Sequence, residues 1–198
     1  MLTGELQGRD IILASRSPRR RELLSGLGVT FRVVVPDIIE DYPEHLERGE
    51  IALHLAEKKA ESVLNEEKDK IAEILVIASD TIVCQGDAML GKPADRNEAL
   101  GMLRQLSGKM HCVITAVCVS DLTRMKSFCS ETQVYFTDLE DEEMEYYVDN
   151  YKPFDKAGSY GIQEWIGYIG IERIEGSYFN VMGLPTQRLY RELRNFFK

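Results

Sequence analysis

Two short segments of the chain combine residue types that suit phosphate chemistry. The first, RSPRRR (residues 16–21), places serine and arginine side chains where a helix would begin. Free backbone N–H groups, the positive end of a helix dipole and guanidinium groups all favour an anion such as phosphate. The second, Ser79-Asp80-Thr81, puts a carboxylate directly after an apolar run. Together the two segments indicate an anion site beside an acidic group.

The arginines of the first segment also have a simpler interpretation. Arg19, Arg20 and Arg21 fall in the first helical turn, where each positive charge is unfavourable by about 0.3–1 kcal/mol. They could extend into solvent or pair with distant carboxylates, as surface arginines commonly do. Departures from local preference are expected at functional sites. Anion binding and solvent exposure therefore both stay open at this point.

Buried strands are predicted to lead into both segments. Residues 11–15 and 74–78 are nearly continuous apolar runs, which are typical of strands buried on both faces. Ser17 and Pro18 then predict the N-cap and first residue of a helix. In open α/β sheets, ligands bind beyond the carboxyl ends of such strands. We therefore expect Ser15 and the Ser79-Asp80-Thr81 segment to share one site.

Two lysines are candidate ligands for the same anion. Lys59 lies inside the apolar arc of a helix predicted over residues 51–64, so it is expected to point inward. Such a lysine either extends its ammonium back to water or reaches an anion in a cleft. Lys92 is fixed before Pro93. Asp80 has an alternative role as a structural hydrogen-bonding group, because a carboxylate between apolar strands needs partners.

Further elements follow from turn and cap residues. Gly86-Asp87 predicts the turn of a hairpin, and Asp95 predicts the cap of a helix over residues 96–106. Alternating apolar residues predict a strand at 168–174. Thr137 is expected to cap the acidic helix that follows it. His111 is interpreted as a structural hydrogen-bonding residue, since no nucleophile pattern accompanies it.

Composition limits the class of protein. The chain has 198 residues, 44% of them hydrophobic, and a net charge of -9, which fits a single globular domain over 1–198. The charge argues against general nucleic-acid binding. The N-terminus lacks a signal-peptide pattern and no apolar run is long enough to span a membrane, so we expect a cytoplasmic protein. Its four cysteines show no metal-binding spacing and are expected to be reduced.

Several motifs in one order identify a family resemblance. They are LASRSPRR, LAEKKA, ASDTIV with GKP, LSGKMHCVITAV, DKAGSYGIQ and GSYFNVMGLP. Along almost the whole chain, the sequence resembles the Maf family, also called septum formation proteins, of nucleoside triphosphate pyrophosphatases. The resemblance implies a Maf/ITPase-like α/β fold, in which an elongated mixed central sheet is flanked by two lobes with the active cleft between them.

The resemblance also implies a reaction and roles for particular residues. Members of this family hydrolyse nucleoside triphosphates between the α and β phosphates, with a divalent cation such as Mg²⁺ or Mn²⁺. Asp80 resembles the proton acceptor that prepares the attacking water. Glu40 resembles a carboxylate that helps Asp80 to carry the metal, which needs only one or two protein carboxylates. The residues that resemble the triphosphate ligands are Ser15, Arg20, Lys59 and Lys92.

Three positions resemble those that set base preference within the family. Arg19, Thr81 and Gln163 match the branch that acts on dTTP, UTP and related pyrimidine nucleotides. A sister branch that acts on a methylated guanosine triphosphate has an aromatic residue, glutamine and glutamate there. A glutamine amide both donates and accepts, which matches the O4 and N3–H edge of thymine or uracil. Arg16 stands where relatives often have a smaller residue, and its role stays open.

Three hypotheses are therefore carried forward. The first is a pyrophosphatase acting on dTTP and UTP, with modified pyrimidine nucleotides as further substrates; a pyrophosphatase for a methylated GTP is the alternative to it. The second is a non-catalytic nucleotide sensor that acts in division control through a partner protein. The third, a nucleic-acid-binding protein that uses the arginine cluster, is opposed by the net charge. Relatives are often dimeric, so a homodimer is a further hypothesis, although the sequence itself does not show whether two chains associate.

Overall fold

A mixed sheet forms the centre of the structure. A computed structural model describes residues 4, 6–69 and 73–198. Its strands are β1 (Asp10–Ala14), β2 (Arg32–Val34), β3 (Ile74–Gln85), β4 (Ala88–Leu90), β5 (Met110–Ser120), β6 (Met125–Phe136) and β7 (Ile171–Glu175). They make a seven-stranded sheet in the order β2-β1-β3-β5-β6-β7, with β4 paired to β3. Both parallel pairs (β1–β2, β1–β3) and antiparallel pairs (β3–β4, β6–β7) occur, which confirms the predicted α/β class with a mixed sheet.

Helices connect most of the strands. They are α1 (Pro18–Gly26), α2 (Arg48–Glu67), α3 (Arg96–Leu106), α4 (Asp141–Tyr151), α5 (Trp165–Gly170), α6 (Tyr178–Val181) and α7 (Thr186–Phe196), with two 3₁₀ turns at Pro153–Asp155 and Ala157–Ser159. Two predicted caps are confirmed: the Ser17 side chain accepts from the Arg20 N–H at 3.4 Å, and Asp95 accepts from the N–H groups of Asn97 and Glu98. No described helix combines the length and apolar character needed to cross a membrane.

The chain forms two compact units, each assembled from separate segments. The first unit comprises Met1–Asp80, Thr115–Ser130 and Gly183–Lys198. The second comprises Thr81–Ile114 and Glu131–Met182. Strands β3, β5 and β6 therefore contribute residues to both units.

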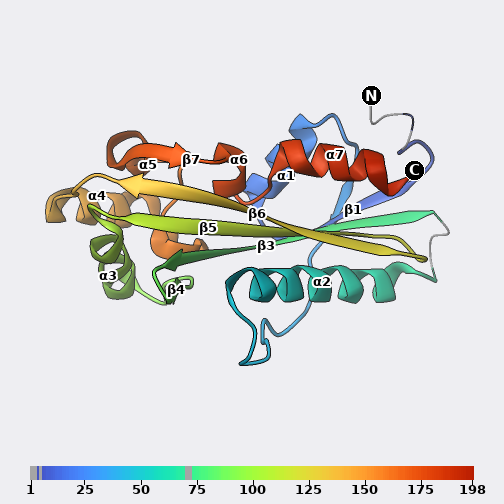
Figure 1. Cartoon of the computed structure of the whole chain (residues 1–198), viewed down its shortest axis with the longest axis horizontal. Helices are drawn as coiled ribbons and strands as arrows, with labels where there is room; N and C mark the ends of the chain where they lie inside the picture. Colours follow the sequence, from blue (N-terminus) through green and yellow to red (C-terminus); the bar gives the residue numbers. More distant parts are fainter. Residues whose placement is uncertain (1–3, 5, 70–72) are drawn as a thin grey trace. The chain divides into compact units, whose positions relative to one another are not determined.

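The first unit has a doubly wound arrangement. The parallel order β2-β1-β3 requires the chain to move in opposite directions through its two crossovers. Because such crossovers are right-handed, they place α1 and α2 on opposite faces of the strands. Figure 1 shows α2 on one side, with α1 and α7 on the other. Strands β1 and β3 are buried on both faces, as their continuous apolar runs predict, whereas β2 is half-buried. Among the fully buried side chains are Ile12, Leu13, Leu24, Leu75, Ile77 and Leu189.

The second unit is built around helices α3, α4 and α5. Its core includes Leu103, Leu106, Tyr147 and Ile166, all with no exposed surface. An aromatic cluster lies at the start of β5, where the rings of His111, Phe136 and Tyr160 pack edge to face with centroids 5.0–5.3 Å apart. The His111 Nε2 lies 2.7 Å from the Tyr160 hydroxyl. His111 is thus a buried, hydrogen-bonded core residue, as predicted.

Three local predictions differ from the structure. The strand before Ser79 does not end there: β3 continues to Gln85 because β4 takes over its pairing beyond Thr81. The acidic helix α4 is capped by Glu140, whose side chain forms a reciprocal capping box with Glu143, so Thr137 is not the cap. The strand predicted over residues 168–174 begins only at Ile171, because the preceding residues complete α5.

Candidate functional site

The end of β1 and the middle of β3 bring the polar segments together. In the register of β1 with β3, Ala14 lies opposite Ala78. Ser15 and Ser79 therefore follow at the same level, one residue further along each strand. Ser15 is buried, and its hydroxyl accepts from the Ser17 N–H at 3.1 Å, so the start of α1 is held close to the end of β1. The expectation that these two segments converge is confirmed.

Arg20 points back towards the strands and does not extend into solvent. Its Nη1 donates to the Ser79 carbonyl oxygen at 2.6 Å, and its Nε donates to the Gly183 carbonyl oxygen at 2.8 Å. Burial lowers the pKa of Arg20, the Asp80 and Glu40 carboxylates act to raise it, and the Arg19 guanidinium acts to lower it. Arg20 consequently lies within electrostatic reach of the other three charged groups. Arg20 is thus half-buried and hydrogen-bonded to the backbone, so its side chain does not simply extend into solvent.

Lys59 joins two acidic side chains. Its Nζ lies 2.5 Å from Asp80 Oδ1 and 2.6 Å from Glu40 Oε1. Lys59 is 7% exposed and Asp80 is 8% exposed, so this pair is buried, whereas Glu40 is exposed. Sequence analysis predicted the inward direction of Lys59 from the apolar arc of α2, and the burial of Lys59 confirms it. A buried ion pair is held only where both charges keep partners, and here one ammonium serves two carboxylates.

The acidic pair suits a divalent cation, although it is not a complete metal cage. Among the described residues, no cluster of three or more histidine, cysteine, aspartate or glutamate side chains could enclose a metal ion. Glu40 and Asp80 reach the same ammonium group and so present their carboxylates to a common space. Mg²⁺ usually takes one or two protein carboxylates and completes its shell with phosphate oxygens and water. The donor set therefore fits a metal that arrives with a polyphosphate.

The other predicted site residues lie at the borders of this group or in the second unit. Arg19 is half-buried in the first turn of α1, and Arg16 is exposed before that helix. Thr81 follows Asp80 on β3 and is half-buried. Lys92 is exposed two residues after the end of β4, and Gln163 is half-buried two residues before α5. The structure thus brings Ser15, Arg20, Lys59, Asp80 and Glu40 together in the first unit, while Lys92 and Gln163 belong to the second.

The second unit contains another polar cluster, which was not predicted from the sequence. Glu164 receives hydrogen bonds from the Tyr147 hydroxyl and from Gln163 Nε2, and forms an ion pair with Lys156 at 3.1 Å. The Gly161 N–H donates to the Tyr147 hydroxyl at 3.0 Å. Lys156 and Gln163 both stand in the motif DKAGSYGIQ, which was the available signal. The local pattern could not show that Tyr147, on α4, would meet that motif.

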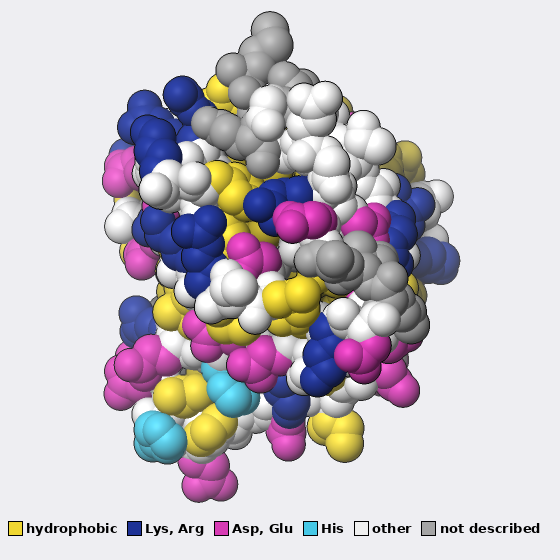
Figure 2. Space-filling view, turned by 90° about the vertical axis from the view of Figure 1, so that its right-hand side faces the viewer, with side chains coloured by type: hydrophobic (Ala, Val, Ile, Leu, Met, Phe, Trp, Pro, Cys, Tyr) yellow, Lys and Arg dark blue, Asp and Glu magenta, His cyan; other side chains and the backbone are white. Residues whose placement is uncertain are grey.

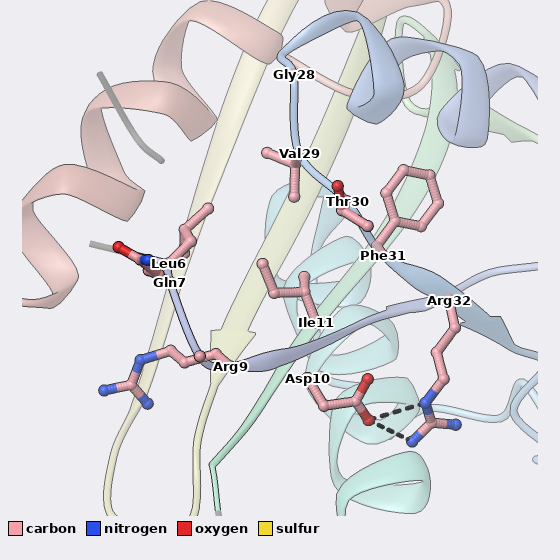
Figure 3. Close-up of a pocket in the computed structure, with 11 residues that line it drawn as sticks. Leu6, Gln7, Arg9, Asp10, Ile11, Gly28, Val29, Thr30, Phe31 and Arg32 are labelled. Atoms are coloured by element: carbon pink, nitrogen blue, oxygen red, sulfur yellow. Dashed lines mark hydrogen bonds and ion pairs between the residues drawn. The ribbon is translucent and has the colours of Figure 1, made fainter. Parts of the chain in front are cut away.

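A separate pocket of about 470 Å³ lies at the opposite end of β1 and contains none of the predicted site residues. Figure 3 shows it between the segments that lead into β1 and β2. At its border, Arg32 donates to Asp10 at 2.8 Å and to Glu67 at 2.6 Å. Its lining residues are Leu6, Gln7, Gly8, Arg9, Asp10, Ile11, Gly28, Val29, Thr30, Phe31 and Arg32. Because the ligand end of a parallel strand is its carboxyl end, this pocket is not the candidate site.

Comparison with known proteins gives relatives over nearly the whole chain. A dTTP/UTP pyrophosphatase of Parabacteroides distasonis is 53% identical over 187 residues, covering 94% of this chain and 95% of that protein. One from Porphyromonas gingivalis is 51% identical over 187 residues, covering 94% of each chain. One from Cytophaga hutchinsonii is 46% identical over 197 residues, covering 100% of this chain and 88% of that protein.

Two further comparisons concern the fold and the family. A solved structure, the Ham1 protein of Staphylococcus aureus, aligns with a TM-score of 0.44 and 15% sequence identity, covering 93% of this chain and 100% of that chain. The family model described as Maf-like protein matches residues 10–196. With that match and relatives of about 50% identity, the chain belongs to the Maf family.

Proposed function

We propose that this protein is a nucleotide pyrophosphatase that hydrolyses dTTP and UTP to the monophosphate and pyrophosphate. The observation that carries the proposal is the convergence of Arg20, Lys59, Asp80 and Glu40, which places cations and carboxylates near the carboxyl end of β1. The choice of dTTP and UTP as substrates follows the relatives of about 50% identity, because each of them is named a dTTP/UTP pyrophosphatase.

In the proposed reaction, Asp80 accepts a proton from the attacking water. The water oxygen forms a bond to the α-phosphorus, the bond to the bridging oxygen breaks, and pyrophosphate leaves. Asp80 suits this role because its carboxylate is nearly buried and lies two residues beyond the level at which β1 ends, on the side of the sheet where ligands of α/β proteins bind. A positioned general base typically contributes about 10²–10⁴-fold to the rate.

The triphosphate is proposed to be bound by Ser15, Arg20, Lys59 and Lys92. Cations that lie beside the phosphates oppose the negative charge that develops on them in the transition state, which is the usual dominant contribution to such reactions. Arg20 is already fixed by the carbonyl groups of Ser79 and Gly183. A fixed guanidinium needs little reorganisation when the substrate binds. The cleft implied by the family resemblance stays a prediction.

Glu40 and Asp80 are proposed to hold the divalent cation, Mg²⁺ or Mn²⁺. When bound, the cation would supply positive charge to the phosphate oxygens.

Arg19, Thr81 and Gln163 are proposed to select the base. The single-domain organisation over 1–198, a cytoplasmic location and a homodimer also belong to the proposal, and sedimentation analysis would test the last.

Asp80→Asn is the decisive substitution for this function. With dTTP and Mg²⁺, we expect the wild-type protein to release monophosphate and pyrophosphate in equal amounts, and the variant to lose about 10²–10⁴-fold in kcat. Nucleotide binding should survive, because asparagine has the shape of aspartate. Asp69→Asn, at an exposed position after α2, is the matched control. Release of orthophosphate by the wild-type protein would contradict the proposal, and so would tight nucleotide binding without any product.

A further inference from the structure

The side-chain amide of Gln163 has one satisfied end and one unsatisfied end. Gln163 Nε2 donates to Glu164 Oε1 at 3.5 Å. Gln163 Oε1 is buried and has no hydrogen-bond partner among the described residues. A carboxylate can only accept, so Glu164 requires the nitrogen end of the amide to face it. A buried carbonyl oxygen without a donor is energetically unfavourable. This oxygen is therefore an acceptor that lacks its donor.

Glu164 is itself held in place by two buried groups. The Tyr147 hydroxyl donates to Oε2, and the Lys156 ammonium lies 3.1 Å from Oε1. Tyr147 has no exposed surface and Lys156 is 7% exposed. Burial, and then the hydrogen bond to Glu164, raises the pKa of Tyr147, so its hydroxyl stays a donor. The carboxylate consequently has a fixed position beside the amide of Gln163.

The backbone leaves room for this arrangement at Gly161. A methyl group at that position would lie 2.9 Å from Gln163 Nε2 and 2.9 Å from the carboxyl carbon of Glu164. The Glu164 N–H also donates to the Gly161 carbonyl oxygen at 2.9 Å, which closes a turn around Gln163. The turn, the carboxylate and its two buried partners form one assembly around a single amide.

We propose that Glu164, held by Tyr147 and Lys156, is a positioning residue that fixes the orientation of the Gln163 amide and thereby makes the site select bases with an N3–H donor. This inference rests on the proposed function and on the role of Gln163 in base selection. Uracil and thymine carry a donor at N3 and an acceptor at O4. Cytosine carries an acceptor at N3 and an amino donor at C4.

The fixed amide matches uracil and thymine but not cytosine. Gln163 Oε1 can accept from N3–H, and the second N–H of Nε2 can donate to O4. Cytosine would place its N3 lone pair against Oε1 and its amino group against Nε2. An amide free to rotate by half a turn would suit cytosine equally well. The carboxylate that prevents this rotation therefore separates UTP from CTP, since a site built for one hydrogen-bonding pattern rejects a ligand that leaves its groups unpaired.

The test compares kcat/KM for UTP and CTP in the wild-type protein and in Glu164→Gln. A glutamine at this position can donate as well as accept, so either orientation of the Gln163 amide is satisfied. We expect the UTP-to-CTP ratio to fall by about tenfold, equivalent to about 1.4 kcal/mol. Tyr147→Phe should lower the ratio in the same direction, and it carries the test if Glu164→Gln does not fold. Glu172→Gln, the same change at an exposed position of β7, should leave the ratio unchanged.

A modified substrate tests the same idea on the unmodified protein. UTP methylated at N3 lacks the donor, so we expect its kcat/KM to be at least about tenfold below that of UTP, the size of one lost hydrogen bond. An unchanged UTP-to-CTP ratio in Glu164→Gln, or an equal loss for both substrates, would overturn the inference. Equal turnover of UTP and CTP by the wild-type protein would also overturn it. Failure of the wild-type protein to release pyrophosphate from any nucleotide would instead reject the proposed function.

Discussion

His111 is a buried residue whose pKa is lowered by its surroundings. Burial lowers its pKa from 6.5 to about 4, its Nδ1 has no hydrogen-bond partner among the described residues, and the rings of Phe136 and Tyr160 surround it. Between pH 6.5 and 4, the unfolded chain binds a proton at this position and the folded chain does not. The free energy of unfolding therefore falls as the pH is lowered through this window.

Because only the unfolded chain is protonated at His111, we expect the free energy of unfolding to fall by about 2 kcal/mol between pH 7 and pH 5. The slope below pH 6.5 is about 1.4 kcal/mol per pH unit. The measurement is urea unfolding at both pH values for the wild-type protein and for His111→Gln. The variant should lose about 2 kcal/mol less than the wild type, since glutamine does not titrate. His45→Gln, at an exposed position, serves as the control. An identical pH dependence in all three proteins would show that His111 can accept a proton without cost.

For single residues, the sequence predicted the direction of a side chain better than it predicted the groups that the side chain contacts. The apolar arc of α2 was sufficient to predict that Lys59 points inward, because side-chain direction on a helix follows from spacing alone. Which carboxylates it meets depends on the positions of β3 and of the loop that carries Glu40. The carbonyl partners of Arg20 were not predictable either, since any residue has a carbonyl group.

At the scale of elements, two helical glycines have opposite surroundings. Gly167 lies in α5, where a methyl group would come within 1.9 Å of the Ile162 carbonyl oxygen, a backbone atom that cannot move aside easily. Gly101 lies in α3, where a methyl group would have nothing within 4 Å. The first glycine is required by packing, and the second only makes the helix less favourable.

These surroundings predict opposite effects of the same substitution. Gly167→Ala should lower the free energy of unfolding by about 3 kcal/mol, the upper part of the usual range for overpacking. Gly101→Ala should raise it by about 0.5–1 kcal/mol, because alanine is the better helix former. Chemical denaturation of both variants beside the wild type measures the difference. A neutral Gly167→Ala would mean that the start of α5 can shift away from Ile162.

Helix starts marked by a nearby capping residue were predicted correctly from the sequence. Boundaries at which two local conformations compete were not. Ser17 with Pro18, and Asp95, mark the true starts of α1 and α3, because a cap bonds to N–H groups only two or three residues away. At α4, two glutamates form a capping box and displace the start from Thr137. Residues 168–170 alternate like a strand, yet they complete a helical turn that packs Ile166 into the core.

At the scale of the whole molecule, charge distribution bears on possible partners. The net charge is -9, and on the face drawn in Figure 2 basic side chains gather at the upper left with acidic side chains between and below them. Arg20 is engaged by backbone carbonyl groups and so does not belong to a free basic surface. A polyanionic duplex would meet acidic side chains together with the basic ones.

We therefore expect no appreciable binding of duplex DNA at physiological salt. Fluorescence anisotropy of a labelled duplex, titrated with the protein at low and high salt, is the measurement. A dissociation constant below about 10 μM that weakens as salt is raised would indicate ordinary non-specific binding and contradict this expectation. Loss of such binding in Arg21→Ala would assign it to the arginine segment.

The way in which the two units share strands limits how relatives can be recombined. The unit boundaries fall at Asp80–Thr81, Ile114–Thr115, Ser130–Glu131 and Met182–Gly183, and the first three lie inside β3, β5 and β6. A chimaera that takes its Gln163-bearing unit from another parent would need junctions within hydrogen-bonded backbone. New substrate preferences should therefore be easier to obtain by point substitution than by exchanging modules.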